Sequence, residues 1–365
     1  MPKKKSLKIG EMEIIPLWSD SLGAKSFSIF VKTPDVGILV DPGVAIMQPS
    51  FPISDEDKFK YWEMAWENIL YYSKLADIII ITHYHYDHYS PSSLEIYKDK
   101  TVLVKNPNEY INYSQRERAV DFYESLYHFL MNSNLKYVQR IKKIQIRDPM
   151  DMLVKAKSID YGDYSERKKS LIEKGRKWFN SLAKKWNEWD LIPEIHTNKT
   201  HFYFADGREF HFGNTNIKFQ QPMFHGIEFS RVGWVIPFTI LYKNKKILYS
   251  SDLNGPIIED YAEWIIEEDP DVLFLDGPAT YMIPYTLNMI NFRRCLKNIE
   301  SIIRNIHAKY IFLDHHVSRD IRFKLRLEKI YNLAKANKKK VITFSEFFGR
   351  KSIAEKIYIK KKNKK

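Results

Sequence analysis

The chain has 365 residues, of which 44% are hydrophobic, so it is long enough to bury a substantial core in one large domain or two smaller ones. Its single cysteine, Cys295, excludes an intrachain disulfide framework and a cysteine-based zinc knuckle, and it indicates a reducing compartment. No apolar stretch approaches the roughly 18–20 residues that span a bilayer, and no signal-peptide core begins the chain. We therefore expect a cytoplasmic protein with no membrane partner.

The net charge of +13 is concentrated near the two ends of the chain. The terminal lysines are Lys3, Lys4, Lys5, Lys8, Lys356, Lys360, Lys361, Lys362, Lys364 and Lys365. Runs of this kind are usually solubilising tails, and we expect residues 351–365 to form a basic, flexible tail. A nucleic-acid partner stays open, because lysine-rich tails attract phosphate without sequence preference.

Short strands separated by turns open the chain, and a helix follows them. The predicted strands cover residues 12–18, 26–33 and 37–43, and the predicted helix covers 55–75. The unbroken run of isoleucine from 78 to 81 predicts a strand that is buried on both faces. Residues 101–107 form the next predicted strand.

Four metal-capable side chains follow the isoleucine run directly: His83, His85, Asp87 and His88 in the segment THYHYDHY. Imidazole and carboxylate are the usual ligands of zinc and related cations. The alternative is a histidine-rich surface turn, which explains neither the aspartate within the cluster nor the apolar strand before it. Because loops at the carboxyl ends of buried strands commonly carry chemistry, the segment predicts a metal site.

Between about residues 108 and 190, strand signals are lost and charged, aromatic helical patterns replace them. We interpret this block as a largely helical insertion, with helices over 116–131 and 166–189. One face of the second helix is either core packing or an aromatic cap over a pocket; it comprises Trp178, Leu182, Trp186 and Trp189. A basic cluster is either a solvated face or a contact for an anionic substrate; it comprises Arg167, Lys168, Lys169, Lys184 and Lys185.

Strand signals return after the insertion and then alternate with helical ones. The predicted strands cover residues 208–212, 215–222, 233–242, 245–252, 271–277, 310–316 and 340–344, and the predicted helices cover about 258–268, 286–306 and 320–337. Two meanders, each followed by alternating strands and helices, indicate an α+β fold in which a pair of sheets is flanked by helices.

The ends of the later strands supply further metal-capable residues. They are His225 in QQPMFHG, Asp252 in ILYSSDLNGP, and the adjacent His315 and His316 in YIFLDHHVSRD. Taken singly, each is better explained by a capping aspartate or by a histidine bonded to the backbone. Together they repeat one pattern, an apolar strand followed by a ligand, which favours a shared site. We predict one cation held by His83, His85 and His225, a second held by Asp87, His88 and His315, and Asp252 as the bridge between them.

This constellation resembles the metallo-β-lactamase superfamily of hydrolases, and most closely an archaeal branch of it. The residues that carry the resemblance are the motif His83-x-His85-x-Asp87-His88, then His225, Asp252 and His315 in order, with Asp41 in ILVDPG before the motif. The resemblance implies an αββα sandwich over residues 1–350, with the helical insertion at about 108–190. It also implies two metal ions, usually zinc, with Mn²⁺ or Fe²⁺ as alternatives. In the same family an aspartate at the place of Asp41 steadies the imidazoles from behind.

The adjacent histidines leave the last ligand ambiguous. We prefer His315, because it leaves its strand in the same setting as the other ligands. Ser318 and Arg319 follow it, similar to an ending found in the phosphodiesterase members of the superfamily. Arg319 either binds an anionic substrate or forms a salt bridge with Asp320.

The resemblance implies a dinuclear metal-dependent hydrolase, since two cations about 3.5–4 Å apart lower the pKa of a water toward neutrality. On this hypothesis Asp87 orients the attacking water, and His316 or Asp276 protonates the leaving group. We expect a phosphodiester or another small ester as substrate, with a lactone or carboxylic ester as the alternative.

Two other classes of function compete with hydrolysis. Two-iron redox relatives replace a histidine of the first motif by a carboxylate and carry a flavin domain, and this chain does neither. A metal-stabilised binding protein without catalysis stays open, although the complete ligand set argues against it.

Overall fold

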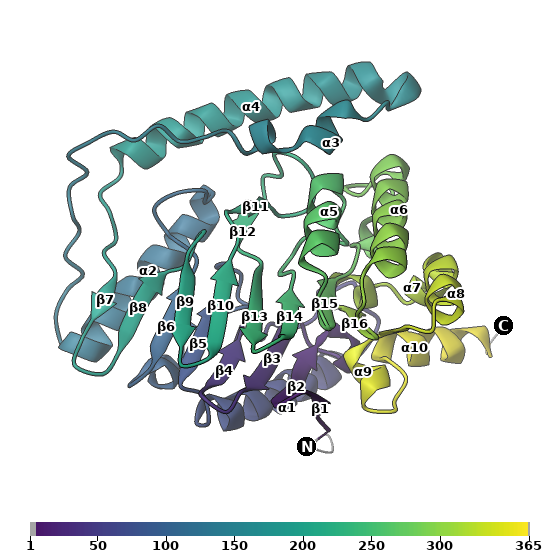
Figure 1. Cartoon of the computed structure of the whole chain (residues 1–365), viewed down its shortest axis with the longest axis horizontal. Helices are drawn as coiled ribbons and strands as arrows, with labels where there is room; N and C mark the ends of the chain where they lie inside the picture. The colour runs from purple at the N-terminus through teal and green to yellow at the C-terminus, as the bar shows by residue number, and fades with distance from the viewer. Residues whose placement is uncertain (1–4, 364–365) are drawn as a thin grey trace.

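Two β-sheets form the centre of the computed structural model, which describes residues 5–363 (Figure 1). The first, eight-stranded sheet has the order β1-β2-β3-β4-β5-β6-β8-β7. Its strands are β1 (Leu7–Ile9), β2 (Met12–Ser19), β3 (Phe27–Lys32), β4 (Gly37–Val40), β5 (Ile78–Ile81), β6 (Thr101–Val104), β7 (Ile195–His196) and β8 (His201–Phe204).

The second, seven-stranded sheet has the order β17-β16-β15-β14-β13-β10-β9. Its strands are β9 (Glu209–Phe212), β10 (Thr215–Phe219), β13 (Phe238–Tyr242), β14 (Lys245–Tyr249), β15 (Val272–Asp276), β16 (Tyr310–Asp314) and β17 (Lys340–Ile342). A separate ribbon pairs β11 (Met223–Phe224) with β12 (Trp234–Val235).

Each sheet changes from antiparallel to parallel pairing part-way across. In the first sheet β1 to β4 pair antiparallel, whereas β4, β5, β6 and β8 pair in parallel. In the second sheet β9, β10, β13 and β14 pair antiparallel, and β14 to β17 pair in parallel. Because parallel strands end at the same edge, the loops that follow them are gathered at one edge of each sheet.

The isoleucine strand β5 shows how the core is layered. Ile78 and Ile80 belong to the apolar cluster between the two sheets, whereas Ile79 and Ile81 belong to the cluster beneath the outer helices. All four side chains are essentially inaccessible to solvent, as predicted for a strand covered on both faces. Each contributes about 2 kcal/mol through burial.

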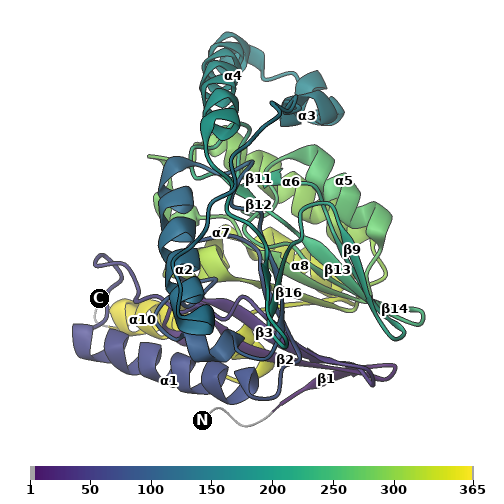
Figure 2. The ribbon, with the colours of Figure 1, turned by 90° about the vertical axis from the view of Figure 1, so that its left-hand side faces the viewer.

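Helices cover the outer face of each sheet (Figure 2). On the first sheet lie α1 (Asp55–Ser73) and α2 (Tyr113–Met131); on the second lie α5 (Glu259–Glu268), α6 (Met289–Asn305) and α8 (Glu328–Ala336), with the short α7 (Phe323–Arg326) beside them. Helix α1 begins where the Ser54 hydroxyl accepts a hydrogen bond from the Asp57 N–H, as its acidic first turn predicted. The predicted α+β fold, an αββα sandwich, is confirmed.

The predicted insertion over 108–190 has two parts with different roles. Helix α2 belongs to the sandwich, because it packs its apolar face, including Phe122, against the first sheet. The remainder carries α3 (Val154–Ser158) and the long α4 (Ser165–Glu188), which runs above the sheets in Figure 1. On α4, Leu182 and Trp186 are buried, and Trp178 stacks on Trp234 with 5.6 Å between ring centroids. The aromatic face is therefore core packing and not a cap over a pocket.

The C-terminal segment is helical, so the prediction of a flexible tail over 351–365 is wrong for most of it. Helix α9 (Phe344–Phe347) is followed by α10 (Ile353–Lys362). A capping box begins α10: the Ser352 hydroxyl accepts from the Glu355 N–H, and the Glu355 carboxylate accepts from the Ser352 N–H. The buried Ile353 anchors the helix to the body of the protein. Outside the described residues lie Lys3, Lys4, Lys364 and Lys365.

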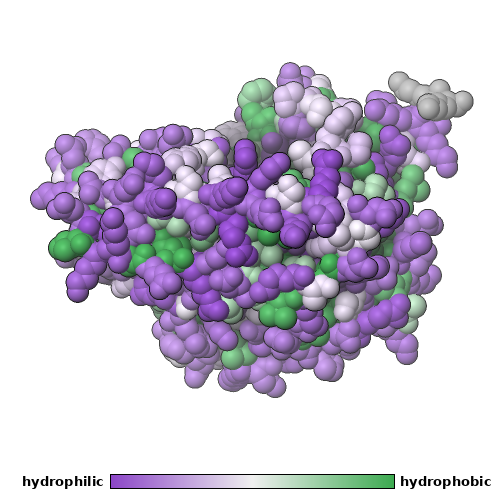
Figure 3. Space-filling view, turned by 90° about the horizontal axis from the view of Figure 1, so that it is seen from above, coloured by the Kyte–Doolittle hydropathy of each residue, from purple (hydrophilic) through white to green (hydrophobic). Residues whose placement is uncertain are grey.

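The surface of the insertion is mainly hydrophilic. Figure 3 shows the face crossed by α4, on which apolar side chains form small, separate groups. The most exposed apolar side chains of this segment are Ile141 and Val154, at 92% and 67%. Within residues 5–363, no helix has both the length and the apolar composition that a membrane span requires.

Candidate metal centre

Seven metal-capable side chains meet where strands of the two sheets and of the β11–β12 ribbon end. His83, His85, Asp87 and His88 follow β5, His225 follows β11, Asp252 follows β14, and His315 follows β16. Donor atoms of the centre form three overlapping groups, within each of which all atoms lie within 4.8 Å of one another: His83, His85, His225 and Asp252; Asp87, His88 and His315; and Asp252, His315 and His316. The structure thus brings together the side chains that the sequence assigned to each cation, and their coordination of a metal stays a prediction.

Asp252 divides its two carboxylate oxygens between the groups. Its Oδ1 lies 3.2 Å from His88 Nε2 and 3.5 Å from His315 Nε2. Its Oδ2 lies 3.1 Å from His225 Nε2 and 3.5 Å from His83 Nε2. Because one carboxylate reaches both groups, Asp252 is placed where a bridging ligand would be.

Buried carboxylates accept hydrogen bonds from Nδ1 of two of the imidazoles, on the side away from the centre. His88 Nδ1 donates to Asp41 at 2.8 Å, and His315 Nδ1 donates to Asp20 at 3.0 Å. Each contact fixes the ring so that Nε2 points into the centre, the arrangement that histidine ligands usually need. Asp41 therefore lies in the supporting position that the sequence predicted for it. Asp20 was not identified from the sequence.

Neutral polar groups support two further imidazoles. The Thr82 hydroxyl lies 3.2 Å from His83 Nδ1, and the Asn254 amide nitrogen lies 3.1 Å from His225 Nδ1. Rotation of the Asn254 amide by 180° would present its oxygen to an Nδ1–H. In both rings Nε2 faces the centre, where His83 Nε2 lies 2.9 Å from His85 Nδ1 and His225 Nε2 lies 3.1 Å from Asp252 Oδ2.

The chemistry of the donor set fits cations. His88 Nε2 and Asp252 Oδ1 are buried and form no hydrogen bond with any residue in the described part of the chain, although they face each other. A buried polar atom without a partner costs about 1–3 kcal/mol, so two such atoms in contact require an explanation. A cation between the imidazoles and the carboxylates satisfies both atoms, and nitrogen and oxygen ligands suit zinc, manganese or iron.

The pKa values of His88 and Asp252 also indicate that the donor set fits a cation. Burial disfavours the charged form of His88, but Asp252 and Asp41 outweigh that effect and raise its pKa to about 10. Burial also disfavours the Asp252 carboxylate, but His88, His315 and His83 hold its pKa well below its usual range. The buried carboxylates thus demand positive charge, which a metal would supply in place of the His88 proton.

His316 lies beside its neighbour His315, with 4.3 Å between ring centroids, and faces the other carboxylate oxygen of Asp252. Its Nε2 is 3.9 Å from Asp252 Oδ2, and its Nδ1 is 2.9 Å from Asp276 Oδ1. A left-handed backbone at His315 (φ 65°) turns the chain so that both rings face Asp252. Burial and then Asp252 raise the pKa of Asp276 to about 8. His316 and Asp276 are thus in contact. Their predicted role, protonation of the leaving group, stays a prediction.

Arg319 does not pair with Asp320, the salt-bridge partner that the sequence offered. Its Nη2 lies 3.0 Å from Asp87 Oδ2, and its Nε donates to Asp20. Asp320 pairs instead with Arg326 at 2.6 Å. Arg319 therefore stabilises the carboxylates around the centre. Asp20 follows β2 directly, so its position at a strand end is the signal by which the sequence could have identified it.

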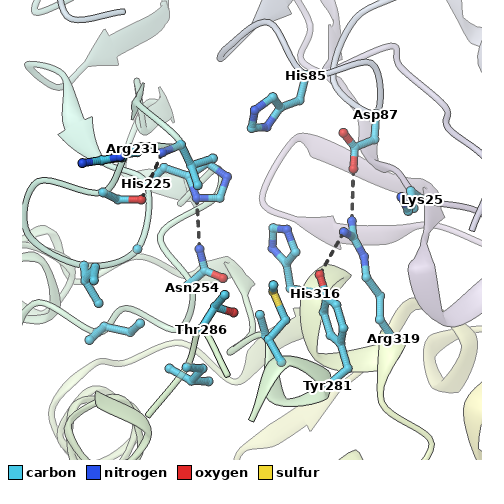
Figure 4. Close-up of a pocket in the computed structure, with 18 of the residues that line it drawn as sticks. Lys25, His85, Asp87, His225, Arg231, Asn254, Tyr281, Thr286, His316 and Arg319 are labelled. Carbon is cyan, nitrogen blue, oxygen red and sulfur yellow. Dashed lines mark hydrogen bonds and ion pairs between the residues drawn. The ribbon is translucent and has the colours of Figure 1, made fainter. Parts of the chain in front are cut away.

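The centre opens into a pocket of about 640 Å³, drawn in Figure 4. His85, Asp87, His225 and His316 point into it from different segments, and Asp252 is buried beneath them. Pockets that hold small molecules have about 300–1,000 Å³, so a compact ligand can reach the metal-capable side chains.

Relatives in sequence are archaeal. The chain is 33% identical to a UPF0282 protein of Korarchaeum cryptofilum, over 92% of this chain and 89% of that protein. The chain belongs to the UPF0282 family. A UPF0282 protein of Methanocaldococcus jannaschii is 30% identical to it over 96% of each chain. No family model matches this UPF0282 chain.

Solved structures that align with this UPF0282 protein have low sequence identity to it. One is the metallo-β-lactamase fold protein YhfI from Bacillus subtilis, with 12% identity and a TM-score of 0.38 over 83% of this chain and 85% of that chain. Another is the short form of human tRNase Z, with 11% identity and a TM-score of 0.36 over 82% and 89%. CmlA, a diiron β-hydroxylase from Streptomyces venezuelae, has 11% identity and a TM-score of 0.42 over 87% and 51%. These similarities concern the fold alone.

Proposed function

We propose that this UPF0282 protein is a dinuclear metal-dependent hydrolase of ester bonds, with a phosphodiester favoured over a carboxylic ester or a lactone. The position of Asp252 carries the proposal, because its two oxygens face two groups of imidazoles beneath an open pocket. A purely structural ion needs one closed ligand group, whereas catalytic ions keep a position open to substrate. The pocket lining also has more cationic than anionic side chains, which favours an anionic ester.

The roles of the protein's own groups follow from their positions. When bound, two divalent cations would lower the pKa of a water and neutralise charge that develops on the ester. Asp87, at the pocket wall, is placed to orient that water. His316 Nδ1 lies 2.9 Å from Asp276 Oδ1, burial favours a proton on Asp276, and His316 lines the pocket, so we assign this pair the protonation of a leaving alcohol.

Metal analysis and a substrate panel test the proposal. Protein purified without chelator should contain close to two equivalents of zinc, manganese or iron. With zinc or manganese added, it should hydrolyse bis(p-nitrophenyl) phosphate faster than p-nitrophenyl acetate or a lactone. Asp252→Ala should abolish turnover and lower the metal content, whereas Asp163→Ala, an exposed aspartate of the insertion, should change neither. Two bound ions with no turnover on any substrate would indicate a metal-stabilised binding protein instead.

A further inference from the structure

The lining of the pocket has an excess of positive charge. Its charged side chains other than histidine are Lys25, Arg118, Arg231, Arg319 and a single carboxylate, Asp87. The pair formed by Arg319 and Asp87 accounts for that carboxylate. Within residues 5–363, none of the other three cations forms an ion pair with a carboxylate. Unpaired cations that converge on a pocket attract an anion.

Lys25 is held at the edge of the pocket nearest Asp87 (Figure 4). Its backbone forms a bridge with Ala45, with hydrogen bonds of 2.8 and 2.9 Å, so the position of its Cα is fixed. Its side chain is half-buried; burial and the nearby Arg319 lower its pKa, although Asp87 and Asp20 act in the opposite direction. Both carboxylates pair with Arg319, so a half-buried lysine at the pocket edge without an ion pair of its own among the described residues is placed to receive an anionic group from outside.

Arg118 reaches the pocket from α2. Its guanidinium lies 5.1 Å from the centre of the Tyr86 ring, and Nη1 donates to the Tyr84 carbonyl at 3.3 Å. Tyr86 stacks in turn on Tyr89, with 5.8 Å between ring centroids, while half of its own surface stays exposed. The stack fixes the guanidinium and leaves most of its N–H donors available to a ligand.

An apolar wall lies in the same pocket. It is formed by Ile227, Val232, Ile257, Met282 and Leu287. These side chains come from the loop after β11, the segment before α5 and the segment between β15 and α6. Apolar side chains beside a charged centre favour a ligand that has an apolar group as well as an anionic one.

We infer that the substrate is a small monoanionic ester with an apolar organic group: Lys25 and Arg118 bind the anion, and the wall around Leu287 binds the organic group. The inference rests on the proposed hydrolase and names its substrate class. For a phosphodiester, hydrolysis consumes one water, breaks one P–O bond, and yields a phosphate monoester and a protonated alcohol. A polynucleotide fits less well, because it needs a track of cations along its backbone and not one pocket.

Three phosphorus compounds without an ester bond test this recognition by isothermal titration calorimetry. Diphenylphosphinate has the anion and apolar groups, dimethylphosphinate has the anion alone, and methyldiphenylphosphine oxide has the phenyl groups without the charge. We expect diphenylphosphinate to bind at least 10-fold more tightly than either analogue. Because bound cations would also attract a phosphinate, variants are needed to isolate the side chains.

Lys25→Met and Arg118→Gln should each weaken diphenylphosphinate binding about 10- to 100-fold, since a hydrogen bond to a charged group is lost. The exposed Lys329→Met and Arg304→Gln serve as matched controls and should bind like the original protein. Leu287→Ser should weaken diphenylphosphinate and leave dimethylphosphinate unchanged.

Two results would overturn the inference: unchanged binding in both cation variants, or displacement of diphenylphosphinate by a short oligothymidylate that binds more tightly. Failure of the proposed hydrolase is distinguishable from failure of this inference. Phosphinate binding that depends on Lys25 and Arg118, without turnover of any ester, would support the recognition and contradict the hydrolysis.

Discussion

Asp41 connects the two sheets at the scale of single residues. Its carboxylate accepts four hydrogen bonds of 2.8 Å, from the N–H and hydroxyl of Thr82, from His88 Nδ1 and from the Tyr249 hydroxyl. Thr82 and His88 follow β5 of the first sheet, whereas Tyr249 ends β14 of the second. The orientation of His88 therefore depends on contacts made by both sheets.

Asp41→Asn should weaken zinc binding about 10- to 100-fold, because an amide leaves at least one of these donors without an acceptor and loosens the His88 ring. Zinc affinity can be measured by competition with a chromophoric chelator. Tyr249→Phe removes one donor and keeps the carboxylate, so it should have a much smaller effect. Equal zinc affinity in Asp41→Asn and the original protein would show that this support is dispensable.

The pair of His316 and Asp276 gives a pH-dependent prediction. Burial and Asp252 raise the pKa of Asp276 to about 8, so the proton is present below that pH and lost above it. Turnover of diphenyl phosphate, whose leaving group benefits from protonation, should therefore fall as the pH rises through about 8. Bis(p-nitrophenyl) phosphate has a better leaving group and should show a weaker decline.

Asp276→Asn isolates the contribution of this proton. It should reduce turnover of diphenyl phosphate about 100-fold and remove the decline near pH 8, as expected for loss of a general acid. Turnover of bis(p-nitrophenyl) phosphate should fall much less. An equal loss on both substrates would indicate a structural role for Asp276.

At the scale of elements, the loop between β11 and β12 is fixed by buried ion pairs. This loop carries His225 and part of the pocket wall. Within it, the buried Glu228 forms ion pairs with Lys168 from α4 and with Arg294 from α6. Arg294 Nη2 lies 2.5 Å from Glu228 Oε1. Lys168, predicted as part of a solvated or substrate-binding cluster, is thus a buried tether between the insertion and the loop.

Glu228→Gln should destabilise the protein by about 3–5 kcal/mol at pH 7, because it leaves the buried Lys168 without its carboxylate and removes one of the two carboxylates that pair with Arg294, the other being Glu259. Burial raises the pKa of Glu228, but Lys168 and Arg294 outweigh it and lower the pKa from 4.5 to about 2. A lowered pKa contributes stability above about pH 4.5, and this contribution is lost as the pH falls toward 2.

Urea unfolding at pH 7 and pH 3 would measure this difference. The gap in unfolding free energy between Glu228→Gln and the original protein should narrow at pH 3. Glu188→Gln, in an exposed pair with Lys185 on the same helix, should unfold like the original protein at both pH values. A gap of equal size at both pH values would contradict the assignment of the ion pairs as its cause.

At the scale of the whole molecule, the strands and their ends could be predicted because parallel strands buried on both faces leave long apolar runs in the sequence. The isoleucine run before His83 is the clearest case. The partnership of Asp20 with His315 could not be predicted, because 295 positions separate them and only the tertiary fold joins them. The helix after Ser352 was missed although its capping box is visible, since its lysines resemble a solvated tail.

Helical spacing could not show which face of the protein a helix covers. Phe122 and its neighbours in α2 have an amphipathic pattern that suits an insertion as well as an outer layer, and packing on β8 decides between them. Similarly, the adjacency of His315 and His316 hides that they face opposite oxygens of Asp252. This arrangement depends on the left-handed backbone at His315, which histidine adopts more readily than most residues but still uncommonly, so the sequence does not predict it.

Because the candidate ligands come from both sheets, bound metal should stabilise the sandwich as a whole. His88 follows β5 in the first sheet, and Asp252 and His315 follow β14 and β16 in the second. Ions that bind only the folded chain add about 2.7 kcal/mol at a free concentration 100 times their dissociation constant. Treatment with a chelator should therefore lower the unfolding temperature by several degrees in differential scanning calorimetry, and added zinc should restore it.

The variant Asp252→Ala separates this effect from general binding of zinc to surface histidines. It removes the carboxylate that faces both groups, so its unfolding temperature should respond to zinc much less than that of the original protein. Backbone hydrogen exchange should show that zinc increases protection at the ends of β5, β14 and β16. His88 follows β5 in the first sheet, and Asp252 and His315 follow β14 and β16 in the second. Protection that increases on only one sheet would mean that zinc does not join the two halves of the sandwich.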